Sequence, residues 1–103
     1  MKVQMNEKKI EQSSEYTVEQ LNNMVIEVAR RKGITKKNDK GLFIGNGDDK
    51  DFSNFGRIVL YLIDQEWFLP YVETWVLYED DDEDDLKAYF IKYLKKDKKV
   101  ERA

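Results

Sequence analysis

The sequence predicts a mainly α-helical fold, a compact single domain of three or four helices with one irregular loop. Two segments, 17–32 and 84–96, combine an apolar stripe with residues typical of helix ends. A chain of 103 residues supports one domain with one core. The alternative is a small α+β domain with short strands near 42–45 and 71–78, because these residues also fit strands.

The two ends of the chain are expected to be flexible. Residues 1–15 lack apolar periodicity, and residues 97–103 form a basic tail, which leaves a single globular domain at 16–96. The first residues are polar and mixed in charge, unlike a secretion signal. The longest apolar run, Ile58–Ile63, is too short to cross a membrane. These features predict a cytoplasmic protein without a membrane-spanning segment.

The first helix is expected at residues 17–32. Thr17 is a good N-cap, and Gln20 stands three positions later, as in a capping box. Gly33 supplies a stop signal after three basic residues that suit a helix C-terminus. The apolar face would consist of Val18, Leu21, Val25 and Val28.

The middle of the chain is more ambiguous. Turn-forming residues surround a short strand or apolar plug at 42–44, and a second helix is expected from Asp51 or Ser53. The β-branched run that follows would also suit a buried strand. Pro70 disfavours helical geometry at the residue before it, so the chain breaks or kinks there. The next segment, 70–79, fits a helix or a strand, and we favour the helix.

The last helix is expected at residues 84–96. Its apolar face would consist of Leu86, Tyr89, Phe90, Tyr93 and Leu94. Seven consecutive carboxylates, residues 79–85, are expected to open this helix. Two or three of them are explained by the preference of a helix N-terminus for negative charge, and the others add repulsion.

The composition argues against catalysis and against a bound metal or cofactor. The chain has no cysteine and no histidine, so it lacks the usual zinc ligands and the commonest general base. The glycines of residues 41–47 are not followed by the lysine and hydroxyl residue of a phosphate-binding loop. Residues 51–62 place Leu62 where a calcium-binding loop needs a glutamate. We therefore predict a protein that is not an enzyme.

Aromatic side chains precede the acidic run, and this neighbourhood is the best indication of a site. Aromatic rings beside carboxylates suit lysine and arginine side chains, through stacking and ion pairing. The candidate partner-binding residues are Trp67, Tyr71, Tyr78, Glu79, Asp80, Asp81, Asp82 and Glu83. This pattern favours a small interaction protein, an inhibitor or accessory factor that binds a basic surface of a cationic partner protein.

The alternative function is a nucleic-acid-binding accessory protein. Residues 30–40 carry six cationic side chains against one aspartate, and the C-terminus is rich in lysine. Such segments can contact phosphates, although the sequence holds no nucleic-acid-binding motif. The candidate contacts are Arg30, Arg31, Lys32, Lys36 and Lys37.

Overall fold

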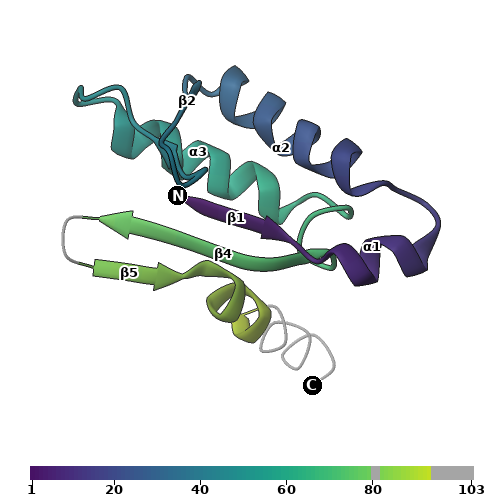
Figure 1. Ribbon diagram of the computed structural model, residues 1–103. Coiled ribbons are helices and arrows are strands. Elements are labelled where there is room, and N and C mark those ends of the chain that lie inside the picture. Colours follow the sequence, from purple (N-terminus) through teal and green to yellow (C-terminus); the bar gives the residue numbers. More distant parts are fainter. Residues whose placement is uncertain (80–81, 94–103) are drawn as a thin grey trace.

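Helices account for 46% and strands for 22% of the residues that the structure describes, so the protein is an α+β domain. The structure, a computed structural model, describes residues 1–79 and 82–93 (Figure 1). It has four helices, a three-stranded antiparallel sheet of order β1-β4-β5, and a two-stranded hairpin of β2 and β3. The prediction of a mainly α-helical fold is wrong, and the α+β alternative describes the architecture.

The N-terminal residues belong to the folded domain, contrary to the expectation of a flexible segment at 1–15. Strand β1 (Lys2–Met5) pairs with β4, and helix α1 (Glu7–Ser13) follows directly. The side chains of Met1, Met5 and Ile10 are buried. Met1, Val3 and Met5 alternate with Lys2 and Gln4, which is the period of a half-buried strand, so the expectation of a flexible segment overlooked a short strand signal.

Helix α2 (Val18–Arg31) confirms the expected first helix and both of its ends. Thr17 Oγ1 accepts the Gln20 N–H at 3.0 Å, and Gln20 Oε1 accepts the Thr17 N–H at 3.4 Å. Gly33 takes a positive φ of 91°, which only glycine adopts without strain. The Ile34 N–H then reaches the Ala29 carbonyl at 2.9 Å, as in a Schellman motif.

The next elements also agree with the sequence analysis. Strands β2 (Lys36–Lys37) and β3 (Phe43–Ile44) form a short hairpin, which places a strand at the expected apolar plug. The Phe43 N–H donates to the Met1 carbonyl at 2.9 Å, so this hairpin is tied to the start of β1. Helix α3 (Asp51–Ile63) begins at one of the two residues expected for it.

Strand β4 (Val72–Glu79) corrects the helix favoured for 70–79. It is the central strand and pairs with β1 on one side and with β5 on the other, both antiparallel. Pro70 lies in the turn before it. The helix and strand periods fit this segment about equally, so pairing with a strand some seventy residues away decides the conformation.

The acidic run does not open the last helix, which is a second correction. Strand β5 (Asp82–Asp85) consists of four acidic residues and pairs with the end of β4. The helix described at 86–93 begins after it, two residues later than expected. Asp80, Asp81, Leu94 and the predicted basic tail at 97–103 lie outside the described residues.

One face of the sheet packs on the helices. Side chains of alternate strand residues, Val3, Met5 and Trp75, join the core formed with α2 and α3, which lie side by side next to β1 (Figure 1). Trp75 is fully buried between Phe68, in edge contact at 4.8 Å, and Phe90, stacked at 5.5 Å. Among the described residues, no helix is long and apolar enough to span a membrane.

Candidate functional site

The feature that stands out is an acidic hairpin, defined here as the described residues Glu79 and Asp82–Asp85. In the β4–β5 register Glu79 lies opposite Asp82, and Tyr78 lies opposite Glu83. All of β5 is exposed. Because side chains alternate along a strand, Glu83 and Asp85 point to the open face of the sheet, beside Tyr78. The hairpin therefore presents carboxylates on both faces of a sheet edge.

Little in the described fold neutralises this charge. The ion pairs in the described part of the chain join Glu27 to Arg30 and to Arg31, and neither involves β5. Asp85 has a local role, because its Oδ1 accepts the Ala88 N–H at 3.1 Å and caps the last helix. The other three carboxylates of β5 make no hydrogen bond or ion pair within the described residues.

Local chemistry does not explain why these residues form a strand. Aspartate is depleted in strands, and like charges close together on a sheet are destabilising. Charged residues on an edge strand do discourage pairing between molecules, which is a purely structural role. Few charged side chains are needed to keep an edge strand from pairing with another molecule, whereas β5 carries four carboxylates in succession. The excess points to a role outside the fold.

The structure brings together only part of the predicted partner-binding set. Tyr78, Glu79, Asp82 and Glu83 lie together at the hairpin, with Tyr78 39% exposed. Asp80 and Asp81 lie outside the described residues.

Trp67 and Tyr71 do not join them. Tyr71 directly precedes β4, so its Cα lies seven residues, or roughly 20 Å, from that of Tyr78 along an extended strand. Tyr71 contacts Tyr16 edge-on at 5.8 Å, and Trp67 contacts Phe68 edge-on at 5.9 Å. Both rings are half-buried and support the core.

Other aromatic side chains, which the sequence analysis assigned to the apolar face of the last helix, lie beside the acidic strand instead. Tyr89 and Phe90 line a shallow groove with Glu83, Asp84 and Asp85. Tyr89 is 61% exposed and Tyr93 is 50% exposed. The four-residue spacing in the sequence already places Tyr89 and Tyr93 on one side of the helix. It does not show whether that side is exposed, because exposure depends on which other elements pack against the helix.

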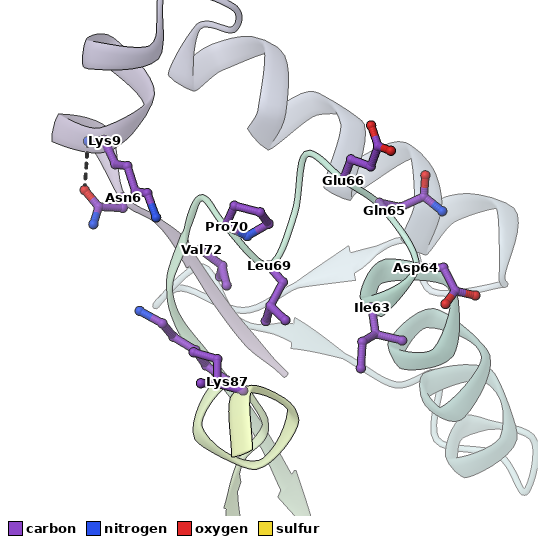
Figure 2. A pocket seen from close by; sticks show the side chains of 11 residues that line it. Asn6, Lys9, Ile63, Asp64, Gln65, Glu66, Leu69, Pro70, Val72 and Lys87 are labelled. Atoms are coloured by element: carbon purple, nitrogen blue, oxygen red, sulfur yellow. Dashed lines mark hydrogen bonds between the residues drawn. The ribbon is translucent and has the colours of Figure 1, made fainter. Parts of the chain in front are cut away.

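A wide pocket lies on the other side of the last helix. Its volume is about 820 Å³, and it is shown in Figure 2. Lys9 and Lys87 stand on one side of it and Asp64 and Glu66 on the other. Its apolar lining is Ile63, Leu69, Pro70, Val72 and Ile91.

The polar groups of this pocket are carboxylates, amides and two lysines. Lys87 Nζ donates to the Glu73 carbonyl at 3.2 Å, so its ammonium is already engaged. The described lining residues include no hydroxyl side chain that could act as a nucleophile. Within residues 1–79 and 82–93, no three acidic side chains are arranged to hold a metal ion.

The predicted nucleic-acid contacts lie at the C-terminal end of α2 and in β2. Arg30 Nε donates to Glu27 Oε2 at 2.9 Å, and Arg31 Nε donates to Glu27 Oε1 at 3.3 Å. These hydrogen bonds lower the pKa of Glu27 to about 2, and the one from Arg30 contributes most. Of the other predicted nucleic-acid contacts, Lys32 and Lys37 place their Nζ atoms over aromatic rings, 5.3 Å from the centroid of Tyr61 and 4.6 Å from that of Phe43. Lys36 is exposed.

Comparisons with family models, with curated proteins and with solved structures found no match for this chain.

Proposed function

We propose that the protein is a small cytoplasmic interaction module that binds a basic surface of a partner protein through its acidic hairpin, as an inhibitor or accessory factor. The observation that carries the proposal is β5, four exposed carboxylates held in an extended strand. An extended strand spaces successive side chains on one face about 7 Å apart, so the carboxylates face a partner as a fixed array. Complementary charge of this kind accelerates association and selects the partner.

The nucleic-acid alternative receives less support. Glu27 forms ion pairs with Arg30 and Arg31. Attraction for phosphate would therefore come mainly from the lysines among the predicted contacts. The acidic hairpin would repel a polyanion that approached from its side of the molecule.

The test compares two variants that change the net charge equally. The first, Asp82→Asn with Glu83→Gln and Asp84→Asn, neutralises the hairpin and keeps the cap at Asp85. The control, Glu11→Gln with Glu15→Gln and Asp49→Asn, neutralises three exposed carboxylates elsewhere. Each protein is used to capture partners from the native cell, and the association rate of each purified partner is then measured at two salt concentrations.

We expect the hairpin variant to unfold at the same temperature as the parent or slightly higher, because like-charge repulsion is relieved. A partner captured by the parent and by the control should associate about tenfold or more slowly with the hairpin variant, and with less dependence on salt. Equal association rates for the two variants would refute the proposed function. So would a large loss of stability in the hairpin variant, since the carboxylates would then be needed by the fold.

A further inference from the structure

An apolar groove lies between α3 and the last helix, next to the acidic hairpin. It is lined by Leu60, Ile63, Asp64, Tyr89, Phe90 and Tyr93, and its volume is about 360 Å³. Leu60, near the C-terminal end of α3, is 65% exposed. The groove thus brings together exposed apolar side chains from two elements. Single exposed apolar residues are common on protein surfaces, whereas a cluster of them indicates a binding surface.

The fold does not need these side chains to hold the last helix. Phe90 stacks on Trp75 at 5.5 Å, and Leu86 is buried, so the helix is anchored through its inner face. Tyr89 and Tyr93 stand beside that face with their rings stacked at 6.3 Å and nearly parallel. Held in this way, the two rings form a rigid wall with little conformational entropy left to lose on binding.

The charges around the groove indicate what would occupy it. Asp64 lies in its lining, and Tyr89 and Phe90 also line the neighbouring groove with Glu83, Asp84 and Asp85. Of the lysines on the last helix, Lys87 is turned to the Glu73 carbonyl. Helical spacing places Lys92 opposite the core-facing Phe90 and three residues after Tyr89, at the outer rim of the groove. The apolar groove therefore continues into an acidic surface.

We infer that this groove receives the apolar side chains of an amphipathic cationic helix of the partner, while the acidic hairpin binds the basic residues of that helix. A groove between two helices suits a third helix, whose anchors recur at every third and fourth residue. The inference rests on the proposed function and adds to it the form of the partner segment. It also separates two contributions, since charge governs the association rate and apolar contact governs dissociation.

The test uses three synthetic peptides of about eighteen residues, roughly 27 Å long as a helix. One is an amphipathic helix of leucine and lysine. The second carries the same number of lysines among glycine and serine, and the third replaces the lysines of the first by glutamine. Dissociation constants are measured by calorimetry for the parent protein, for Tyr89→Ser with Tyr93→Ser, and for Leu60→Ser. The matched control is Phe52→Ser, because Phe52 is 75% exposed on α3 but outside the groove lining.

We expect the parent to bind the amphipathic cationic peptide about tenfold more tightly than the polar cationic peptide, a difference of about 1.4 kcal/mol. Both groove variants should abolish that difference, and the Phe52 variant should preserve it. Circular dichroism establishes that each variant is folded. Since Leu60 and the tyrosines lie on different helices, agreement between the groove variants shows that the groove itself is responsible.

Three outcomes would overturn the inference. The cationic peptides could bind equally well, the Phe52 variant could lose as much affinity as the groove variants, or sedimentation could show a dimer that the groove variants abolish. In the last case a second copy of the chain occupies the groove. Neutralising Asp82, Glu83 and Asp84 should weaken both cationic peptides equally. If that neutralisation has no effect, the proposed function fails, whereas failure of the groove variants alone removes only the inference.

Discussion

Neighbouring aromatic residues of this protein differ sharply in how far they are buried. Trp75 and Tyr78 stand three positions apart on β4, yet Trp75 is fully buried and Tyr78 is 39% exposed. The Trp75 Nε1–H donates to Met1 Sδ at 3.4 Å, so even its polar atom has a partner inside the core. Aromatic content alone predicted a core, but it did not tell which aromatic residues would enter it.

Replacing Trp75 by alanine should therefore cost about 3–5 kcal/mol of unfolding free energy, because it leaves a large cavity between Phe68 and Phe90. Such a loss is most of the stability of a marginal domain. Denaturant unfolding followed by circular dichroism measures the change. Tyr78→Ala is the comparison on the same strand and should alter the midpoint little. Equal effects of the two variants would mean that Trp75 is not the centre of the core.

Asp51 is the residue whose charge matters most to local structure. Its Oδ1 accepts the Asn46 N–H and its Oδ2 accepts the Gly47 N–H, both at 2.8 Å. The bond from Asn46, and then that from Gly47, lowers the pKa of this carboxyl below its ordinary value. A Cβ at Gly45 would collide with the same carboxylate, so the loop is shaped around it.

A lowered pKa means that Asp51 stabilises the fold at neutral pH and that this contribution disappears in acid. The contribution is fully present above the unfolded-state pKa, near 3.8, and is lost as the pH falls through the lower folded-state value. We expect Asp51→Asn to lower the thermal midpoint by a few degrees at pH 7 and to flatten its fall below pH 4. Asp49→Asn, two residues away and exposed, should leave the acid limb unchanged. An unchanged acid limb in the Asp51 variant would contradict this assignment.

At the scale of elements, the sequence predicts helices with local end signals and fails where pairing is distant. Helix α2 carries its own cap and stop, so its bounds follow from neighbouring residues. Strand β4 has no such signals, and its conformation depends on pairing with β1, where the alternation of Met1, Val3 and Met5 with polar residues spans only five positions. Strand β5 contradicts local propensity altogether, because acidic residues favour a helix start over a strand. For the same reason local patterns did not show that Trp67 and Tyr71 pack against the core, away from the acidic hairpin.

Two glycines test the backbone conformation at the end of α2 and in the interior of α3. Gly33 ends α2 with a φ of 91°, and a Cβ there would lie 2.9 Å from Asn54 Nδ2. Gly33→Ala should therefore cost about 1–2 kcal/mol. Gly56 lies within α3 with nothing near the position of a Cβ, so Gly56→Ala should gain about 0.5–1 kcal/mol. Chemical denaturation measures both changes, and effects of the same sign would contradict the two backbone assignments.

At the scale of the whole molecule, the first and the last of the described strands lie in one sheet. β1 and β5 both pair with β4, so the first residues and the acidic hairpin share one central strand. The N-terminal strand thereby supports the surface to which we assign binding, although the two are some eighty residues apart in sequence. Long-range pairing of this kind carries a large loop-closure cost, which the buried side chains of β1 must offset.

Deleting residues 1–5 should consequently abolish cooperative unfolding rather than trim a flexible end. The deletion removes the buried side chains of Met1 and Met5, each worth about 1.5–3 kcal/mol, together with the hydrogen bonds of β1 to β4. That loss is comparable to the whole stability of a domain of this size. Lys2→Ala with Gln4→Ala changes the same strand on its outer face and should leave the transition intact. Thermal scans followed by near-ultraviolet circular dichroism, which reports Trp75, distinguish the cases. A truncated protein that kept the parent's midpoint would show that β1 is dispensable, and the sheet would then be specified by β4 and β5 alone.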